Sequence, residues 1–343
     1  MIPKKFGQLI IGLALAGTFG TLSGCSALYP PVGVVLTHYA NDRVVPEVLA
    51  STDVDMSSCG TGGGLNQLME SFEHVINRPH VVLMDTELLA GYCAETRANE
   101  AHLMYLQAMH DGQSTHARDF HILEQRLQKL TAERRFAAYK DFVAAYGHFG
   151  ESGACPRFSN EMDQAQYMIG LLTSVQAVLS DIQAGSSVGV PQDVVVKVAR
   201  SSMCLNNNKW WGMPEAIRAA AWLSVPGSAP NGVDPQAVMD HAVAVAAQTG
   251  MPLPATFAAI SAFGSGDSAR EEAAIKKFVD IDQQKKTPQK YILLTEIGRL
   301  EALNYSDQIW MQATGARTPF EVLGRFPNDA AASSSPDASG LLN

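Results

Sequence analysis

The sequence predicts an all-α protein of about ten helices. Apolar residues recur three and four positions apart over long stretches, as on one face of a helix. Alternating strand patterns are missing, and the one β-branched run, Val194-Val195-Val196, has helical surroundings. At this length the pattern favours antiparallel helical hairpins stacked in sequence, a degenerate tetratricopeptide-like solenoid, over one large bundle.

Residues 1–24 are typical of a secretory signal. Lys4 and Lys5 form a basic start, and the apolar run over residues 9–19 is too short to span a membrane. The four residues Leu22-Ser23-Gly24-Cys25 match a lipobox, so we expect cleavage before Cys25 and lipidation of its thiol. The alternative is an ordinary secretory signal that happens to end in cysteine.

The residue after the lipidated cysteine indicates the destination. In bacterial lipoproteins an Asp there usually retains the protein at the inner membrane, whereas Ser26 stands here. We therefore expect a palmitate-type acyl anchor in the outer membrane, with the protein facing the periplasm. No later apolar run approaches 18 residues, so lipid is the only anchor that the sequence predicts.

The mature chain divides by composition into a tether, a helical domain and a tail. The tether includes Tyr29-Pro30-Pro31, which we expect to be extended, and the tail is rich in Ala, Ser, Pro and Gly, which predicts disorder. The expected bounds are 25–45 for the tether, 46–327 for the helical domain (possible halves 46–185 and 186–327) and 328–343 for the tail.

Four helices are predicted in the first half. Their expected ranges are from Leu65 until Pro79 ends the helix, 85–109, 116–146 and 160–184. The last of these is apolar nearly all round, which is typical of a helix buried at the centre of a helical assembly.

Prolines mark the helices of the second half. Each stands at a plausible first helical turn, where the missing N–H costs nothing; they are Pro191, Pro214, Pro235, Pro254 and Pro288. Asp234 and Thr287 immediately precede two of them and are predicted N-caps. The helices that follow are rich in alanine, so their axes can approach closely.

Four cysteines remain besides Cys25, and an even number in an exported chain predicts two disulfides. Three pairings are possible. We expect Cys59–Cys93 and Cys155–Cys204, because nearest neighbours close the shortest loops, and each bridge should contribute about 3–4 kcal/mol. Zinc is the alternative, but the chain has no CxxC or HExxH motif. We therefore expect no metal and no cofactor.

The charge of the chain argues against nucleic acid as a partner. The formal net charge is −9, and loss of Lys4 and Lys5 with the signal makes it −9 − 2, about −11. No basic run exceeds a few residues, so nucleic acid and anionic headgroups are poor candidates.

The segment from Asn206 to Pro214 is the least ordinary stretch of the mature chain. Three of the four tryptophans, Trp210, Trp211 and Trp222, lie within thirteen residues. Such rings suit ligand grooves and interface hot spots, and the alternative is packing between the two halves. Because Trp210 and Trp211 are adjacent, we expect one ring to pack inward and the other to face a groove.

Charged residues provide further candidates. Trp310 and Arg317 are candidate ligand or partner contacts, since Arg317 follows a glycine turn and could bind a carboxylate. The alternative is that Arg317 pairs with Asp307 or caps a helix.

Glu100 and Arg134 both fall on predicted apolar stripes, which predicts a buried ion pair between them. A buried carboxylate acting as an acid or base is the other interpretation.

Two stretches resemble the T-component (TatT-like) lipoproteins that accompany tripartite (TRAP) periplasmic transporters. They are Leu68-Met69-Glu70-Ser71-Phe72 through Pro79 with Leu88-Leu89-Ala90-Gly91-Tyr92, and Trp211-Gly212-Met213-Pro214-Glu215-Ala216. The resemblance implies a helical, non-enzymatic scaffold with a pore or groove, which docks a periplasmic protein and passes an apolar or organic-acid ligand.

Three functions follow in order of preference. The first is an adaptor or ligand-binding component in transport of a small organic or lipidic ligand. The second is an envelope scaffold without a small ligand. The third is a hydrolytic enzyme, which lacks support because the chain has no Gly-x-Ser-x-Gly motif and no catalytic residues can be named.

Overall fold

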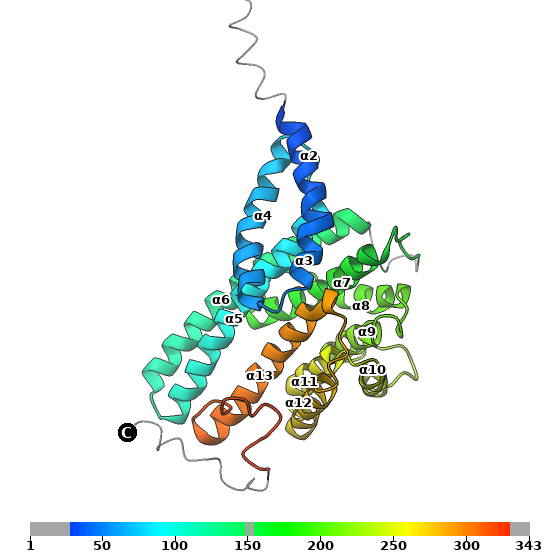
Figure 1. Cartoon of the computed structure of the whole chain (residues 1–343). Helices are drawn as coiled ribbons and strands as arrows, with labels where there is room; N and C mark the ends of the chain where they lie inside the picture. Colours follow the sequence, from blue (N-terminus) through cyan, green and yellow to red (C-terminus); the bar gives the residue numbers. More distant parts are fainter. Residues whose placement is uncertain (1–27, 148–149, 151–153, 330–343) are drawn as a thin grey trace, which may run out of the picture.

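The computed structural model describes residues 28–147, 150 and 154–329, and these residues form an all-α fold without strands (Figure 1). The predicted fold class is confirmed. The N-terminal elements are α2 (Tyr29–Tyr39), the π-helical turn η2 (Ala40–Val44), α3 (Val45–Leu49), η3 (Met56–Thr61), α4 (Gly62–Ser71), η4 (Phe72–His74), α5 (His80–His110), α6 (Ser114–Tyr146) and α7 (Glu161–Gln183).

The second half consists of shorter helices. These are α8 (Val194–Ser201), η5 (Ser202–Cys204), α9 (Met213–Ser224), α10 (Pro235–Thr249), α11 (Leu253–Ser265), α12 (Ser268–Asp282), η6 (Gln289–Tyr291) and α13 (Ile292–Thr314). Pro214, Pro235 and Pro254 stand in first helical turns, as predicted. The run Val194-Val195-Val196 is helical.

One of the two predicted N-caps is present. The side chain of Asp234 accepts a hydrogen bond from the amide of Gln236 and caps α10. Thr287 is not a cap: its hydroxyl donates to the carbonyl of Gly250 and lies 2.9 Å from the hydroxyl of Thr295. It therefore ties the loop before η6 to α13 instead of starting a helix.

The segment that was expected to be extended is helical. α2 begins at Tyr29, and the helix continues through η2 and α3 to Leu49. Pro30 and Pro31 stand in the first turn, where a proline ring is compatible with the helix. Gly33 then permits a close approach to Ile76, whose side chain would lie 3.3 Å from an added Cβ. The signal residues, Cys25 and residues 330–343 lie outside the described residues.

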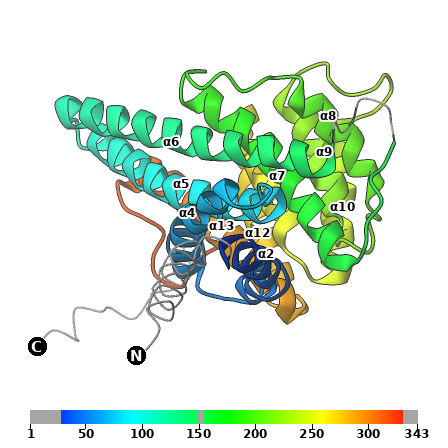
Figure 2. The same cartoon turned by 90° about the horizontal axis from the view of Figure 1, so that it is seen from above.

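Consecutive helices pack against each other, and the last helix closes the assembly. α5 and α6 form a long antiparallel hairpin that extends from the body (Figure 2). α7 packs along α6, and α9 packs against α8, α10 and α11. α13 packs against both α5 and α11, so the C-terminal helix joins the two halves of the chain around the interior (Figure 1).

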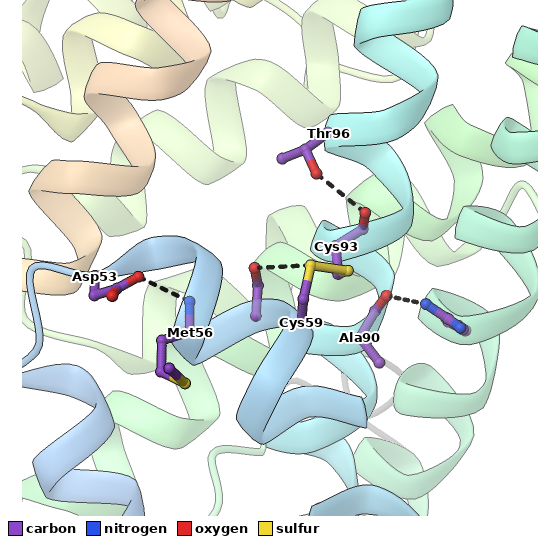
Figure 3. The surroundings of a disulfide bond; sticks show 8 residues. Asp53, Met56, Cys59, Ala90, Cys93 and Thr96 are labelled. Atoms are coloured by element: carbon purple, nitrogen blue, oxygen red, sulfur yellow. Dashed lines mark hydrogen bonds between the residues drawn. A yellow bond between two sulfur atoms is a disulfide. The ribbon is translucent and has the colours of Figure 1, made fainter. Parts of the chain in front are cut away.

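Both predicted disulfides are present. Cys59–Cys93 joins η3 to α5 with an S–S distance of 2.01 Å (Figure 3), and Cys155–Cys204 joins the segment after α6 to η5 with 2.05 Å. The first bridge fixes the N-terminal segment beside the middle of α5. The second bridge ends at Cys204, two residues before the segment from Asn206 to Pro214, which we call the tryptophan-rich turn.

Candidate ligand-binding cavity

An apolar cavity of about 410 Å³ lies among helices of both halves of the chain, with wall residues from η2, α3, η3, α4, α5, α6, α7, α9, α11 and α13. Its volume is within the range of small-molecule sites in proteins. Most of the wall is aliphatic or aromatic, with Leu88, Leu172, Leu179, Phe257 and Ile297 as examples. Such a wall favours an apolar ligand, because binding removes apolar surface from water on both sides.

The helix that the sequence predicts to be apolar nearly all round is α7, and its side chains show how the cavity forms. On α7, Leu171 and Val178 are fully buried in protein, whereas Leu172 and Leu179 line the cavity. α9 and α11 contribute small side chains to the wall, including those of Ala220 and Ser261, together with large ones such as Leu223 and Phe257. The small side chains help to leave a volume that the surrounding residues do not fill.

The cavity reaches the surface at the C-terminal ends of α7 and α11. Ile182 and Phe263 belong to the cavity wall and are also 49% and 38% exposed. Gln183 and Gly264 lie beside them and are exposed as well. These residues therefore form an apolar entrance.

The wall becomes polar where α5, α6 and α13 meet. Arg135 of α6 is 2% exposed, and its guanidinium binds the carboxylate of Glu95 through both terminal nitrogens. One of these nitrogens also donates to the hydroxyl of Ser180 at 2.7 Å. Gly91 leaves room for Arg135 at this crossing, since an added Cβ would lie 3.1 Å from Cγ of Arg135, a tight contact.

Glu301 of α13 and two tyrosines complete this polar end. Burial, assisted by the negative charge of Glu95, raises the pKa of Glu301 to about 8. Its carboxyl group is therefore mostly protonated at pH 7. Burial is also the main cause that raises the pKa of Tyr92 and of Tyr305, and the charge of Glu301 adds to it.

Two buried donors at the polar end are unpaired. Within the described part of the chain, neither the hydroxyl of Tyr92 nor Nε of Arg135 makes a hydrogen bond of normal length, although the Tyr92 hydroxyl lies close enough to the Glu301 carboxyl for each group to shift the pKa of the other. Both residues line the cavity, and Tyr92 is 4% exposed. An unpaired buried polar group costs roughly 1–3 kcal/mol, so a ligand that pairs these groups would gain affinity.

A second polar point of the wall is Asp85. It precedes Glu95 by ten residues on α5, which corresponds to about 15 Å along the helix. Its Oδ2 accepts a hydrogen bond from Nε2 of Gln166 at 2.8 Å, and this amide also donates to Asn41. Burial raises the pKa of Asp85 to about 7. Oδ2 of Asp85 is thus paired with Gln166, whereas its buried Oδ1 has no hydrogen-bond partner among the described residues.

The tryptophan-rich turn does not form part of this cavity. Trp210 is 1% and Trp211 9% exposed, and both rings pack edge-on against Tyr291 at centroid distances of 5.8 and 5.3 Å. The expectation that one of the two rings faces a groove is therefore wrong. Gly212, with φ of 84°, allows the turn to approach α10, where an added Cβ would lie 2.4 Å from the carbonyl oxygen of Ala242.

The other two tryptophans are half-buried and have local partners. The ring of Trp222 lies 5.6 Å from the guanidinium of Arg218. Nε1 of Trp310 donates to the carbonyl of Arg325 and holds the C-terminal loop on α13. Neither ring belongs to the cavity wall.

The predicted buried pair of Glu100 and Arg134 is wrong. Glu100 is exposed and binds Arg317 through two hydrogen bonds of 2.9 and 2.6 Å. Arg134 donates to the carbonyl of Ala90. The carboxylate partner of Arg317 is thus Glu100 of the same chain, and not a ligand or Asp307. Oδ1 of Asp307 instead accepts a hydrogen bond from the amide of Thr318.

The sequence interpretation missed Glu95, Arg135 and Glu301. The available signal was a set of charged residues on helices whose other inward positions are small or apolar. Among the described residues, no group of three or more potential ligands is arranged to hold a metal ion, and no helix combines the length and hydropathy that membrane crossing requires.

The comparisons with known proteins identify no relative. No family model matches the chain, and neither a curated protein nor a solved structure matches it significantly.

Proposed function

We propose that this protein is a non-enzymatic lipoprotein that binds an apolar organic or lipidic ligand on the periplasmic face of the outer membrane. The observation that carries the proposal is the apolar cavity of about 410 Å³ with its entrance between α7 and α11. In this role the protein would act as an adaptor in transport, as the resemblance to TatT-like lipoproteins implies, and would pass the ligand to a periplasmic protein partner.

Binding can be tested by filling the cavity. Ala220→Phe adds a ring to the cavity wall without adding a polar group. Ala244→Phe adds the same ring at an exposed position of α10 and is the matched control. Native mass spectrometry of protein from its host should show a bound small molecule in the wild type and the control, but not in Ala220→Phe. Equal occupancy in both variants would remove the cavity from the proposal.

The N-terminal helix supports the proposed anchor. Leu28, the N-cap of α2, and Val32, Val35 and Tyr39 within it recur at helical spacing and are 49–64% exposed, so they form one apolar stripe on the surface. The sequence places Cys25 three residues before Leu28, which is at most about 11 Å of extended chain. A lipid on Cys25 would therefore hold this stripe near the bilayer, where apolar helix faces bind.

The anchor is tested at Cys25 and at α2. Intact-mass analysis should find acyl mass on Cys25 in membranes, and Cys25→Ser should release the protein. In that released form, Val35→Glu should weaken flotation with phospholipid vesicles more than Val34→Glu, because Val34 is exposed but lies off the stripe. An unmodified Cys25 would refute the proposed lipidation and localisation.

The two alternative functions make different demands. A scaffold without a ligand does not need the cavity, so an empty protein after native purification would favour it. A hydrolase needs a nucleophile beside a base. Nδ1 of His80 lies 2.6 Å from Asp141, but in the described part of the chain no hydroxyl or thiol bonds to this imidazole, and Arg78 also binds Asp141.

A further inference from the structure

We propose that the polar end of the cavity binds the uncharged oxygen function of an otherwise apolar ligand, such as a hydroxyl, ester or ketone group. This inference rests on the proposed function, since it assumes that the cavity holds a ligand. It is carried by the groups that α5, α6 and α13 bring together: the ion pair of Arg135 with Glu95, the carboxyl of Glu301, and the unpaired hydroxyl of Tyr92.

The charges at this end already balance. The positive charge of Arg135 is matched by the carboxylate of Glu95, which receives both terminal nitrogens. Glu301 adds no charge while it is protonated, and its pKa of about 8 keeps most of it protonated at pH 7. A ligand therefore meets a neutral surface that contains strong dipoles.

The unpaired atoms define what the ligand must supply. Nε of Arg135 carries an N–H that can only donate, and the hydroxyl of Tyr92 can donate as well. An oxygen with free lone pairs could accept from both groups. A hydrocarbon without oxygen would leave both donors unpaired, and so would gain only from the apolar wall.

Charged head groups fit this end less well. A carboxylate would bring a second negative charge beside Glu95, which is the same repulsion that helps to keep Glu301 protonated. An ammonium group has no lone pair for Nε of Arg135 and adds a positive charge beside its guanidinium. A carboxylate would find no free positive charge, because Arg135 is already paired with Glu95. An ammonium group would find a negative charge only after Glu301 gives up its proton.

The test compares four C12 probes that differ only in the head group: dodecanol, methyl dodecanoate, dodecanoate and dodecylammonium. The protein is the full mature chain carrying Cys25→Ser, so that no detergent is needed. Displacement of the neutral fluorophore N-phenyl-1-naphthylamine is measured at pH 7. Dodecanol and methyl dodecanoate should bind at least about tenfold more tightly than both ions, which corresponds to about 1.4 kcal/mol.

A single-atom variant then tests the donor. Tyr92→Phe removes the hydroxyl, so it should reduce the preference for dodecanol over dodecanoate at least threefold, with each probe compared against the fluorophore affinity measured for the same variant. Tyr39→Phe, on exposed α2, is the matched control and should change neither value. A preference that is the same in both variants would exclude Tyr92 from head-group binding.

The outcomes separate this inference from the proposed function. If the fluorophore binds but all four probes compete equally, or an ion competes best, the head-group inference is wrong and the cavity still binds apolar ligands. If neither the fluorophore nor any probe binds, the proposed function fails together with the inference.

Discussion

The tryptophan-rich turn and the polar end of the cavity are both buried, yet they are constructed in opposite ways. At the turn, Nε1 of Trp210 donates to Gln164, and the side chain of Asn207 pairs with both the amide and the carboxylate of Glu215. At the cavity, Tyr92 and Arg135 keep unpaired donors next to empty volume, in the part of the chain that is described. The turn has the packing and the paired polar groups of a protein core, whereas the cavity has the volume and the unpaired donors of a binding site.

This difference shows that unusual composition is a weak guide to a binding site. Tryptophans attract attention because they are rare, but a ring that is surrounded by protein only stabilises the fold. A ligand needs volume and unsatisfied groups; at the cavity the volume lies among leucines and other apolar residues, and the unsatisfied groups that we use belong to a tyrosine and an arginine. The following predictions test this contrast, and the last one provides a reference outside both regions.

The largest expected effect is on stability at the turn. Trp210→Ala should lower the free energy of unfolding by about 3–5 kcal/mol, because the ring fills a tightly packed site. Leu179→Ala, in the cavity wall, should cost less than about 2 kcal/mol, because one side of this side chain already lacks packing partners. Urea unfolding of both variants measures the two values, and equal losses would erase the contrast.

The two disulfides provide a second comparison, because each lies near one of the two regions. Replacing either pair by alanines should cost about 2–5 kcal/mol, and the loops of 34 and 49 residues are similar enough for comparable losses. Only the loss of Cys59–Cys93 should also weaken ligand binding, since Cys93 follows Tyr92. Thermal unfolding and fluorophore titration of both double variants test this, and weaker binding after loss of Cys155–Cys204 would contradict it.

The pH dependence of stability tests Glu301. Its pKa of about 8 in the folded protein exceeds the ordinary value of 4.5, so the unfolded chain loses this proton first. The contribution of Glu301 to stability should therefore fall as the pH rises from about 4.5 to about 8. The groups that face Glu301 are Glu95, Tyr92, Tyr305 and Arg135.

Glu301→Gln should abolish this part of the slope, because an amide does not titrate. Unfolding at pH 5 and pH 8 should thus show a smaller loss of stability for the variant than for the wild type. Asp85→Asn is a control at the far end of the cavity: the Asp85 pKa of about 7 should also produce a slope, but over a lower pH range. If Glu301→Gln keeps the pH dependence of stability of the wild type, the Glu301 carboxyl of the wild-type protein is ionised over the whole range from pH 5 to pH 8.

The smallest effect is expected at the Glu100–Arg317 pair, which belongs to neither region. Both side chains are about half exposed, and exposed ion pairs typically contribute 0.2–1 kcal/mol. Arg317→Ala should therefore lower stability by less than about 1 kcal/mol and leave ligand binding unchanged. A loss of binding would restore Arg317 as a ligand contact.

The sequence was sufficient to predict the helical class, the disulfide pairing and most helices, because these depend on local periodicity and on cysteine spacing. It misplaced the buried face of α6. The large apolar residues of α6, among them Leu123 and Leu127, predict a stripe that also includes Arg134. Leu127 is buried as predicted, but Leu123 is 41% exposed, and the buried face also includes Thr131, Arg135 and Ala138. Small residues face α5 because the two helices pack closely.

That shift by one residue on α6, about 100° around the helix, explains why Arg135 and not Arg134 is the interior cation. The interior pair exists, but it joins Glu95 to Arg135 instead of Glu100 to Arg134. The cavity itself could not be predicted, since an apolar residue that lines a void has the same pattern as one that packs in a core. Only the three-dimensional structure shows that Leu172 lines the cavity, whereas its neighbour Leu171 packs in the core.

The closing position of α13 links ligand binding to completion of folding. The cavity wall contains Val44 from the first helical segment and Tyr305 from the last helix, 261 positions later (305 − 44). Contacts between such distant residues form slowly, because closing a long loop costs entropy before any contact is gained. A ligand that needs both ends of the wall binds only the complete fold, so it stabilises finished molecules over partly folded ones. Occupancy of the cavity would thus report that the whole chain has folded.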